Sequence, residues 1–115
     1  MKDLLGRKIK VMDYIAYALT VGRSANLAVY QVREVFDDKV KANKLTESYG
    51  WMNGEYPYLK GVKRKYVNHR WNYQQNTYEY SEMTPEEKAK VDSSTTTLKM
   101  PERALILDNF NPETL

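Results

Sequence analysis

The sequence contains no cysteine and only one histidine, His69. Without thiols it can form no disulfide framework, no cysteine nucleophile and no cysteine-ligated zinc site, which is typical of a chain in a reducing cytoplasm. A transition-metal site would need carboxylates, but the acidic pairs Asp37-Asp38 and Glu86-Glu87 are better explained as turn and helix-start residues. We therefore expect no metal ion and no other cofactor.

Long apolar runs are also missing. The strongest one near the N-terminus, Ile15 to Leu19, is far shorter than the roughly 20 residues that span a bilayer, and the start MKDLLGRKIK lacks the apolar centre of a signal peptide. Taking Met1 as the native start, we expect a cytoplasmic chain without a membrane partner.

The sequence has no phosphate-binding loop, no dinucleotide-binding glycine motif and no nucleophile elbow. His69 lies between Asn68 and Arg70, a setting more typical of a surface or ligand-contacting residue than of a general base. These observations predict a protein that is not an enzyme and has no catalytic residues.

The chain has 115 residues, of which 42% are hydrophobic and 29% charged, as expected for one globular domain over residues 1–115. Its first half has the composition of β structure. The sequence predicts strands over 8–18, 27–36 and 39–45, with a bend at Asp13, a loop over 20–26 and a turn at Asp37-Asp38.

The second half is less regular. Glycines and a proline predict a loop over 46–61, and a second hairpin is expected from Lys63 to Val67 and Trp71 to Tyr80, with its turn near Gln75-Asn76. Thr84-Pro85-Glu86-Glu87 predicts a capping box and a short helix that ends near Val91. We further expect a strand over 95–100, a tight turn over 101–103, a closing strand over 104–107 and an extended tail over 108–115.

Together these elements predict a mainly β fold: a small five-stranded SH3-like barrel, with the layout of KOW, Tudor and Sm-type modules. An inserted hairpin and loop region over about 46–94 and one short helix would decorate it. The stretches Asp13 to Ala18 and Gly22 to Val32 also resemble small, uncharacterised proteins of tailed bacteriophages, as does the closing segment Pro101 to Asn111. This resemblance implies a barrel and a phage setting, and it implies no activity.

The main functional clue is an overlap of positive charge and aromatic rings in the middle of the chain. No acidic residue lies between Lys60 and Arg70, and nine of the fourteen aromatic residues lie between Tyr49 and Tyr80. Phosphates attract lysine and arginine, and bases stack on flat rings, each stack contributing about 1–3 kcal/mol. The candidate ligand-binding residues are therefore Lys63, Arg64, Lys65, Tyr66, His69, Arg70, Trp71 and Tyr73.

This region also has a purely structural explanation, because tyrosine and tryptophan favour strands and fill cores. If Lys63 to Val67 is extended, only alternate side chains of the segment could face one ligand. A second, weaker candidate site is the loop at Gly22, where backbone N–H groups could hold a phosphate beside Arg23 and Ser24. A plain hairpin loop explains that segment better.

The leading prediction is a non-enzymatic phage accessory protein that binds an anionic, base-containing ligand through its basic, aromatic surface. The ligand would be nucleic acid, or a nucleotide immune signal that a homo-oligomer sequesters from host defence. The second hypothesis is a module that binds and inhibits a host protein, because tyrosine, tryptophan and arginine are also typical of interface hot spots. A structural virion component is the third.

Overall fold

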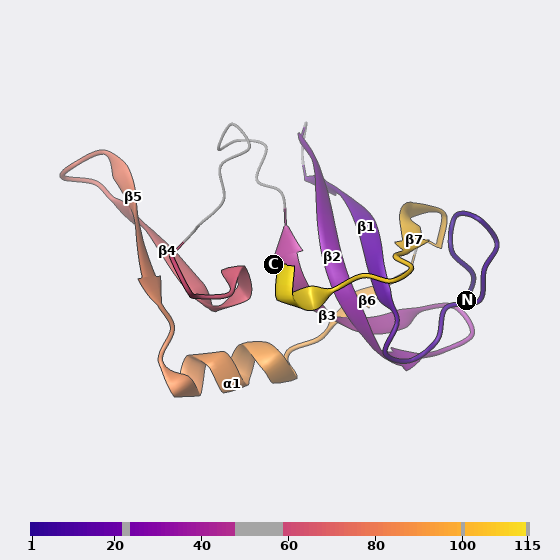
Figure 1. The fold of residues 1–115 in the computed structure, drawn as a ribbon. Helices are drawn as coiled ribbons and strands as arrows, with labels where there is room; N and C mark the ends of the chain where they lie inside the picture. The colour runs from indigo at the N-terminus through magenta and orange to yellow at the C-terminus, as the bar shows by residue number, and fades with distance from the viewer. Residues whose placement is uncertain (22–23, 48–58, 100, 115) are drawn as a thin grey trace.

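The computed structural model describes residues 1–21, 24–47, 59–99 and 101–114, and the fold is mainly β (Figure 1). Five strands form one antiparallel sheet in the order β6-β3-β2-β1-β7. They are β1 (Tyr14–Val21), β2 (Ser24–Val35), β3 (Val40–Glu47), β6 (Thr96–Leu98) and β7 (Ala104–Ile106). The last strand therefore lies beside the first, and the Ile106 N–H of β7 donates to Asp3 of the N-terminal segment.

The first three strands confirm the predicted hairpins, but the loop predicted over 20–26 is wrong at both ends, because β1 extends to Val21 and β2 begins at Ser24. Asp37 and Asp38 lie between β2 and β3, where the Phe36 N–H donates to the Lys39 carbonyl at 2.9 Å. The strand predicted from Lys8 begins only at Tyr14. The reason is a turn in which the Asp13 carboxylate accepts the Lys10 N–H at 2.8 Å, so the predicted bend at Asp13 is present.

One face of the sheet carries the hydrophobic core. Ile15 lies opposite Tyr30 and Tyr17 lies opposite Ala28, so alternate residues of β1 and β2 point to this side. They pack with Val32 of β2 and with buried side chains from the N-terminal segment and the other strands, namely Ile9, Val40, Ala42, Leu98 and Ala104. The core thus draws on both halves of the chain.

The opposite face, here called the outer face, carries the cross-strand neighbours Tyr14, Gln31 and Asn43 on β1, β2 and β3. Asn43 is buried, and its side-chain amide donates to the carbonyl groups of Val91 and Ser94 at 2.7 and 2.8 Å. Val91 lies in the last turn of α1 (Pro85–Ser93), where its carbonyl also accepts the N–H of the C-cap residue Ser94 at 3.2 Å. The amide therefore fixes the end of α1 on the outer face.

The middle of the chain forms a separate hairpin of β4 (Val67–Asn72) and β5 (Thr77–Glu82). Its predicted turn near Gln75-Asn76 is confirmed, and Asn76 has a φ of 53° there. The predicted strand over 63–67 is wrong, because Arg64–Tyr66 form a 3-10 turn, η2. In Figure 1 the hairpin stands apart from the five-stranded sheet, whereas η2 and the end of α1 contact β3.

The later elements are close to expectation, with one exception. Thr84 and Glu87 form the predicted capping box, in which each side chain accepts the other residue's backbone N–H, at 3.3 and 3.0 Å. A 3-10 turn, η3 (Pro101–Arg103), leads into β7 as predicted. The extended tail over 108–115 is wrong: Asn109 has a φ of 56° and Pro112–Thr114 form a 3-10 turn, η4, so the tail folds back toward the sheet.

The five strands do not close into a barrel within the part of the chain that the structure describes. β6 and β7 are the two edges of the sheet and pair with β3 and β1 only. The mainly β class is confirmed, and the SH3-like closure stays a prediction. No helix among the described residues has the length and apolar character needed to cross a membrane.

A buried carboxylate, Asp3, ties the N-terminal segment to the C-terminal end of the sheet. It accepts the backbone N–H groups of Leu5, Arg7 and Ile106 at 2.9 to 3.0 Å. The Arg7 guanidinium pairs with Asp3 and also with Asp108. Burial raises the pKa of Asp3, but the N–H donors of Ile106 and Arg7 and the Arg7 charge outweigh it and leave the pKa below 3.8.

Asp3→Ala should lower the free energy of unfolding by about 3 kcal/mol, because buried donors lose their common acceptor. Since the native pKa is lowered, the stabilisation from Asp3 is present above pH 3.8 and is lost as the pH falls through the native value. Denaturant titrations at neutral pH and below pH 3.8 measure both effects. Asp108→Ala, which removes an exposed partner of Arg7, is the control and should change stability little. Equal losses in the two variants would contradict this role for Asp3.

Candidate functional site

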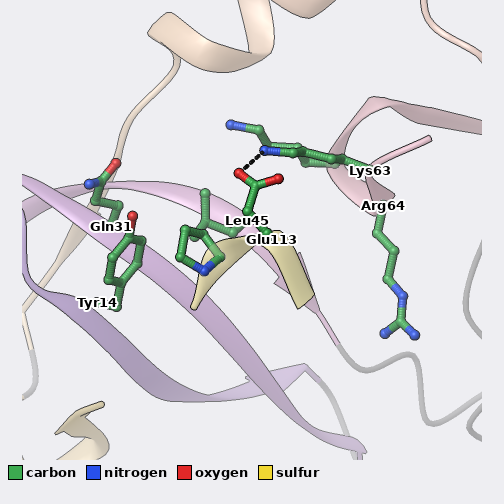
Figure 2. A pocket seen from close by; sticks show the side chains of 8 residues that line it. Tyr14, Gln31, Leu45, Lys63, Arg64 and Glu113 are labelled. Carbon is green, nitrogen blue, oxygen red and sulfur yellow. Dashed lines mark hydrogen bonds and ion pairs between the residues drawn. The ribbon is translucent and has the colours of Figure 1, made fainter. Parts of the chain in front are cut away.

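A pocket of about 240 Å³ lies between the outer face of the sheet, η2 and the folded-back tail (Figure 2). The sheet contributes an aromatic ring, an amide and an apolar side chain, η2 contributes positive charge, and the tail contributes a proline and a carboxylate. The lining residues are Tyr14, Gln31, Leu45, Lys63, Arg64, Lys65, Pro112 and Glu113. The three consecutive cations predicted as ligand-binding residues thus line one pocket.

The three cations are directed differently. The Lys63 ammonium lies 3.1 Å from the Glu113 carboxylate, and both side chains are well exposed to solvent. Figure 2 shows the Arg64 side chain turned away from that pair. The Lys65 ammonium lies 2.8 Å from the Asp92 carboxylate of α1, with only 16% of its side chain exposed. Of the three, Lys63 is the cation best placed to meet a ligand in the pocket.

Lys65 and Tyr66 have a structural role. The Tyr66 hydroxyl donates to the Asp92 carboxylate at 2.8 Å, and the ammonium groups of Lys65 and Lys88 lie 5.1 and 5.4 Å from the Tyr66 ring centre. The Lys65 ammonium keeps the pKa of Asp92 low even though partial burial acts to raise it. Burial, together with the bond to Asp92, raises the pKa of Tyr66 to about 12. These contacts hold η2 against α1 and thereby place Lys63 and Arg64 at the pocket.

The remaining predicted residues lie on the hairpin. His69 pairs across the strands with Tyr80, and Trp71 pairs with Tyr78, so these four rings share one face of the hairpin. Arg70 and its partner Glu79 lie on the other face. The Trp71 and Tyr78 ring centres are 4.9 Å apart, and the Tyr73 side chain in the turn is 88% exposed. The hairpin therefore carries an aromatic face and a polar face.

The charges and rings predicted to share one surface are thus divided between two places. Lys63, Arg64 and Lys65 line the pocket, while His69, Trp71 and Tyr73 belong to the hairpin. Gly22 and Arg23 lie outside the described residues, as does the side chain of Ser24, which begins β2. The rings that accompany the pocket cations are instead Tyr14 and, packed on it with ring centres 5.2 Å apart, Phe110.

The sequence patterns did not predict the lining residues that the sheet and the tail contribute to this pocket. Tyr14 and Gln31 are cross-strand neighbours, and alternation along strands could have assigned them to the side opposite the core. No sequence pattern predicted Glu113 as a lining residue, because its approach to Lys63 depends on the turn at Asn109. In the described part of the chain, histidine, aspartate and glutamate side chains form no group of three that could hold a metal ion.

No protein-family model, curated protein or solved structure matches this chain. The functional argument therefore depends on the geometry of the pocket and the hairpin.

Asp92→Asn should lower the pKa of Tyr66 from about 12 part of the way toward 10.0. The negative charge of Asp92 disappears in this variant, whereas burial, the largest cause of the raised pKa, remains. In the wild type the raised pKa implies a stabilisation that is present below pH 10.0 and is lost as the pH rises toward the native value. An NMR titration of the Tyr66 ring carbons measures the pKa directly. Tyr66→Phe serves as the assignment control, and an unchanged Tyr66 titration in Asp92→Asn would contradict the proposed contact.

Proposed function

We propose that this protein is a non-enzymatic binder of a small anionic ligand that carries a base, and that the ligand occupies the pocket at η2. Lys63 would meet the phosphate, the Tyr14 ring would contact the base, and the Gln31 amide would hydrogen-bond to its edge. The observation that carries the proposal is the convergence of these three groups on one pocket of about 240 Å³.

The chemistry of the lining supports a ligand with both a charged and a flat part. Hydrogen bonds from a lysine to an anion are stronger than neutral ones, and amide side chains can form paired hydrogen bonds with a base edge. Leu45 of β3 adds apolar surface between the charged and the aromatic sides. Ligand pockets commonly combine such apolar walls with a few polar groups that fix orientation.

The arrangement of charge favours a nucleotide over a long nucleic-acid strand. A strand binder needs a row of cations along the backbone path. Here Lys65 is paired with Asp92, and Arg70 lies on the polar face of the projecting hairpin. A site with Lys63 as its main cation fits one phosphate group, and its affinity should depend only weakly on salt.

We also propose an SH3-like fold and a phage origin, which the strand order and the sequence support. The strand order β6-β3-β2-β1-β7, with a 3-10 turn before the last strand, supports an SH3-like arrangement of the five strands. The resemblance of the early strands to small phage proteins supports a phage accessory protein. Sequestration of a nucleotide immune signal is the activity we propose for it, and only the pocket chemistry supports that activity. A host-inhibiting interaction module is the alternative, supported by the exposed Tyr73 at the tip of the projecting hairpin.

Lys63→Ala should weaken binding of AMP by about 10- to 150-fold, because a hydrogen bond to a charged group contributes roughly 1.5–3 kcal/mol. Lys65 is left intact in this test because it holds η2 to α1. Isothermal titration calorimetry with AMP, adenosine and ribose 5-phosphate separates the contributions of phosphate and base. We expect AMP to bind more tightly than either fragment.

Lys60→Ala is the matched control, since Lys60 is an exposed cation of the same segment and does not line the pocket. It should bind AMP like the wild type. Equal weakening in the Lys60 and Lys63 variants would show nonspecific attraction to net charge, and no binding of AMP by the wild type would reject AMP-like ligands at this pocket.

A further inference from the structure

The tail places its own carboxylate where the proposed ligand would place an anionic group. Glu113 lines the pocket and lies 3.1 Å from the Lys63 ammonium, the cation assigned to the phosphate. Figure 2 shows Glu113 over the pocket with its carboxylate directed at Lys63. A carboxylate and a phosphate compete for the same ammonium because both are anionic acceptors.

The tail is fixed at its start and only lightly held at its end. The Leu107 N–H donates to the Tyr14 carbonyl at 2.8 Å, Asn109 turns the chain back with a φ of 56°, and Phe110 packs on Tyr14. The Asn111 side chain then accepts the Glu113 N–H at 3.0 Å and shapes η4. The Glu113 side chain is 72% exposed, and ion pairs with such exposure are weak.

We infer that the tail is an internal competitor of the pocket: Glu113 occupies the anion position and Phe110 covers the Tyr14 ring until a ligand displaces them. This inference rests on the proposed function, because it regulates the same site. The backbone hydrogen bond from Leu107 to the Tyr14 carbonyl keeps the displaced tail close to the pocket, so that it returns when the ligand leaves. Ligands with more negative charge than one carboxylate are favoured, because they compete better for Lys63.

The test is AMP binding by full-length Glu113→Gln, with Glu102→Gln as the control. Glu102 is an exposed acid of η3 that does not line the pocket, so the control changes net charge equally. Because an exposed ion pair contributes little, Glu113→Gln should bind AMP about two- to fivefold more tightly than the wild type, and Glu102→Gln should not differ from it. Equal affinities of wild type and Glu113→Gln would overturn the competitor role while leaving the proposed function intact.

A second readout follows the tail itself. On saturation with AMP, the {1H}-15N nuclear Overhauser effect of the Phe110 and Glu113 amides should fall, because the displaced tail moves freely. A rise in these values would mean that the tail closes over the ligand and would overturn the inference. Absence of AMP binding in both wild type and Glu113→Gln would reject the proposed ligand class, and the competitor role with it.

Discussion

The side-chain amide of Asn43 is the contact on which the second layer of the molecule depends. From the outer face of the sheet, this buried amide donates to the Val91 and Ser94 carbonyl groups at the end of α1. Asp92 lies in that same last turn and receives both the Lys65 ammonium and the Tyr66 hydroxyl. One buried amide therefore positions the helix end, the helix end positions η2, and η2 holds Lys63 above the sheet.

This docking determines which side chains line the pocket that we propose as the ligand site. It draws the cations of η2 to the sheet and leaves the rings of β4 and β5 on a hairpin that projects from it. The pocket then obtains its ring from Tyr14 and its amide from Gln31, two neighbours on the outer face. A compact site with one well-directed cation suits a single charged group and a flat base, whereas a polymer would need charge spread along a path.

Elements whose structure depends on residues close together in the sequence could be predicted. The Asp37-Asp38 turn and the Thr84 capping box depend on residues only a few positions apart, and both are present. The turn at η2 could not be predicted in this way, because Tyr66 meets a carboxylate 26 residues further along the chain. The folded-back tail likewise depends on Tyr14 and Lys63, which are distant in sequence. Three of the eight lining residues could therefore be predicted, as a run of cations, and the other five join them only through tertiary contacts.

The most direct test of the pocket as the ligand site is a map of backbone amide shifts in a 1H-15N NMR titration with AMP. A ligand at η2 predicts that the largest changes fall on Tyr14, Gln31, Lys63 and the amide of Glu113, with the hairpin turn at Tyr73 unaffected. Changes centred on Trp71 and Tyr73, with the pocket residues unmoved, would contradict this assignment and place binding on the aromatic face of the hairpin.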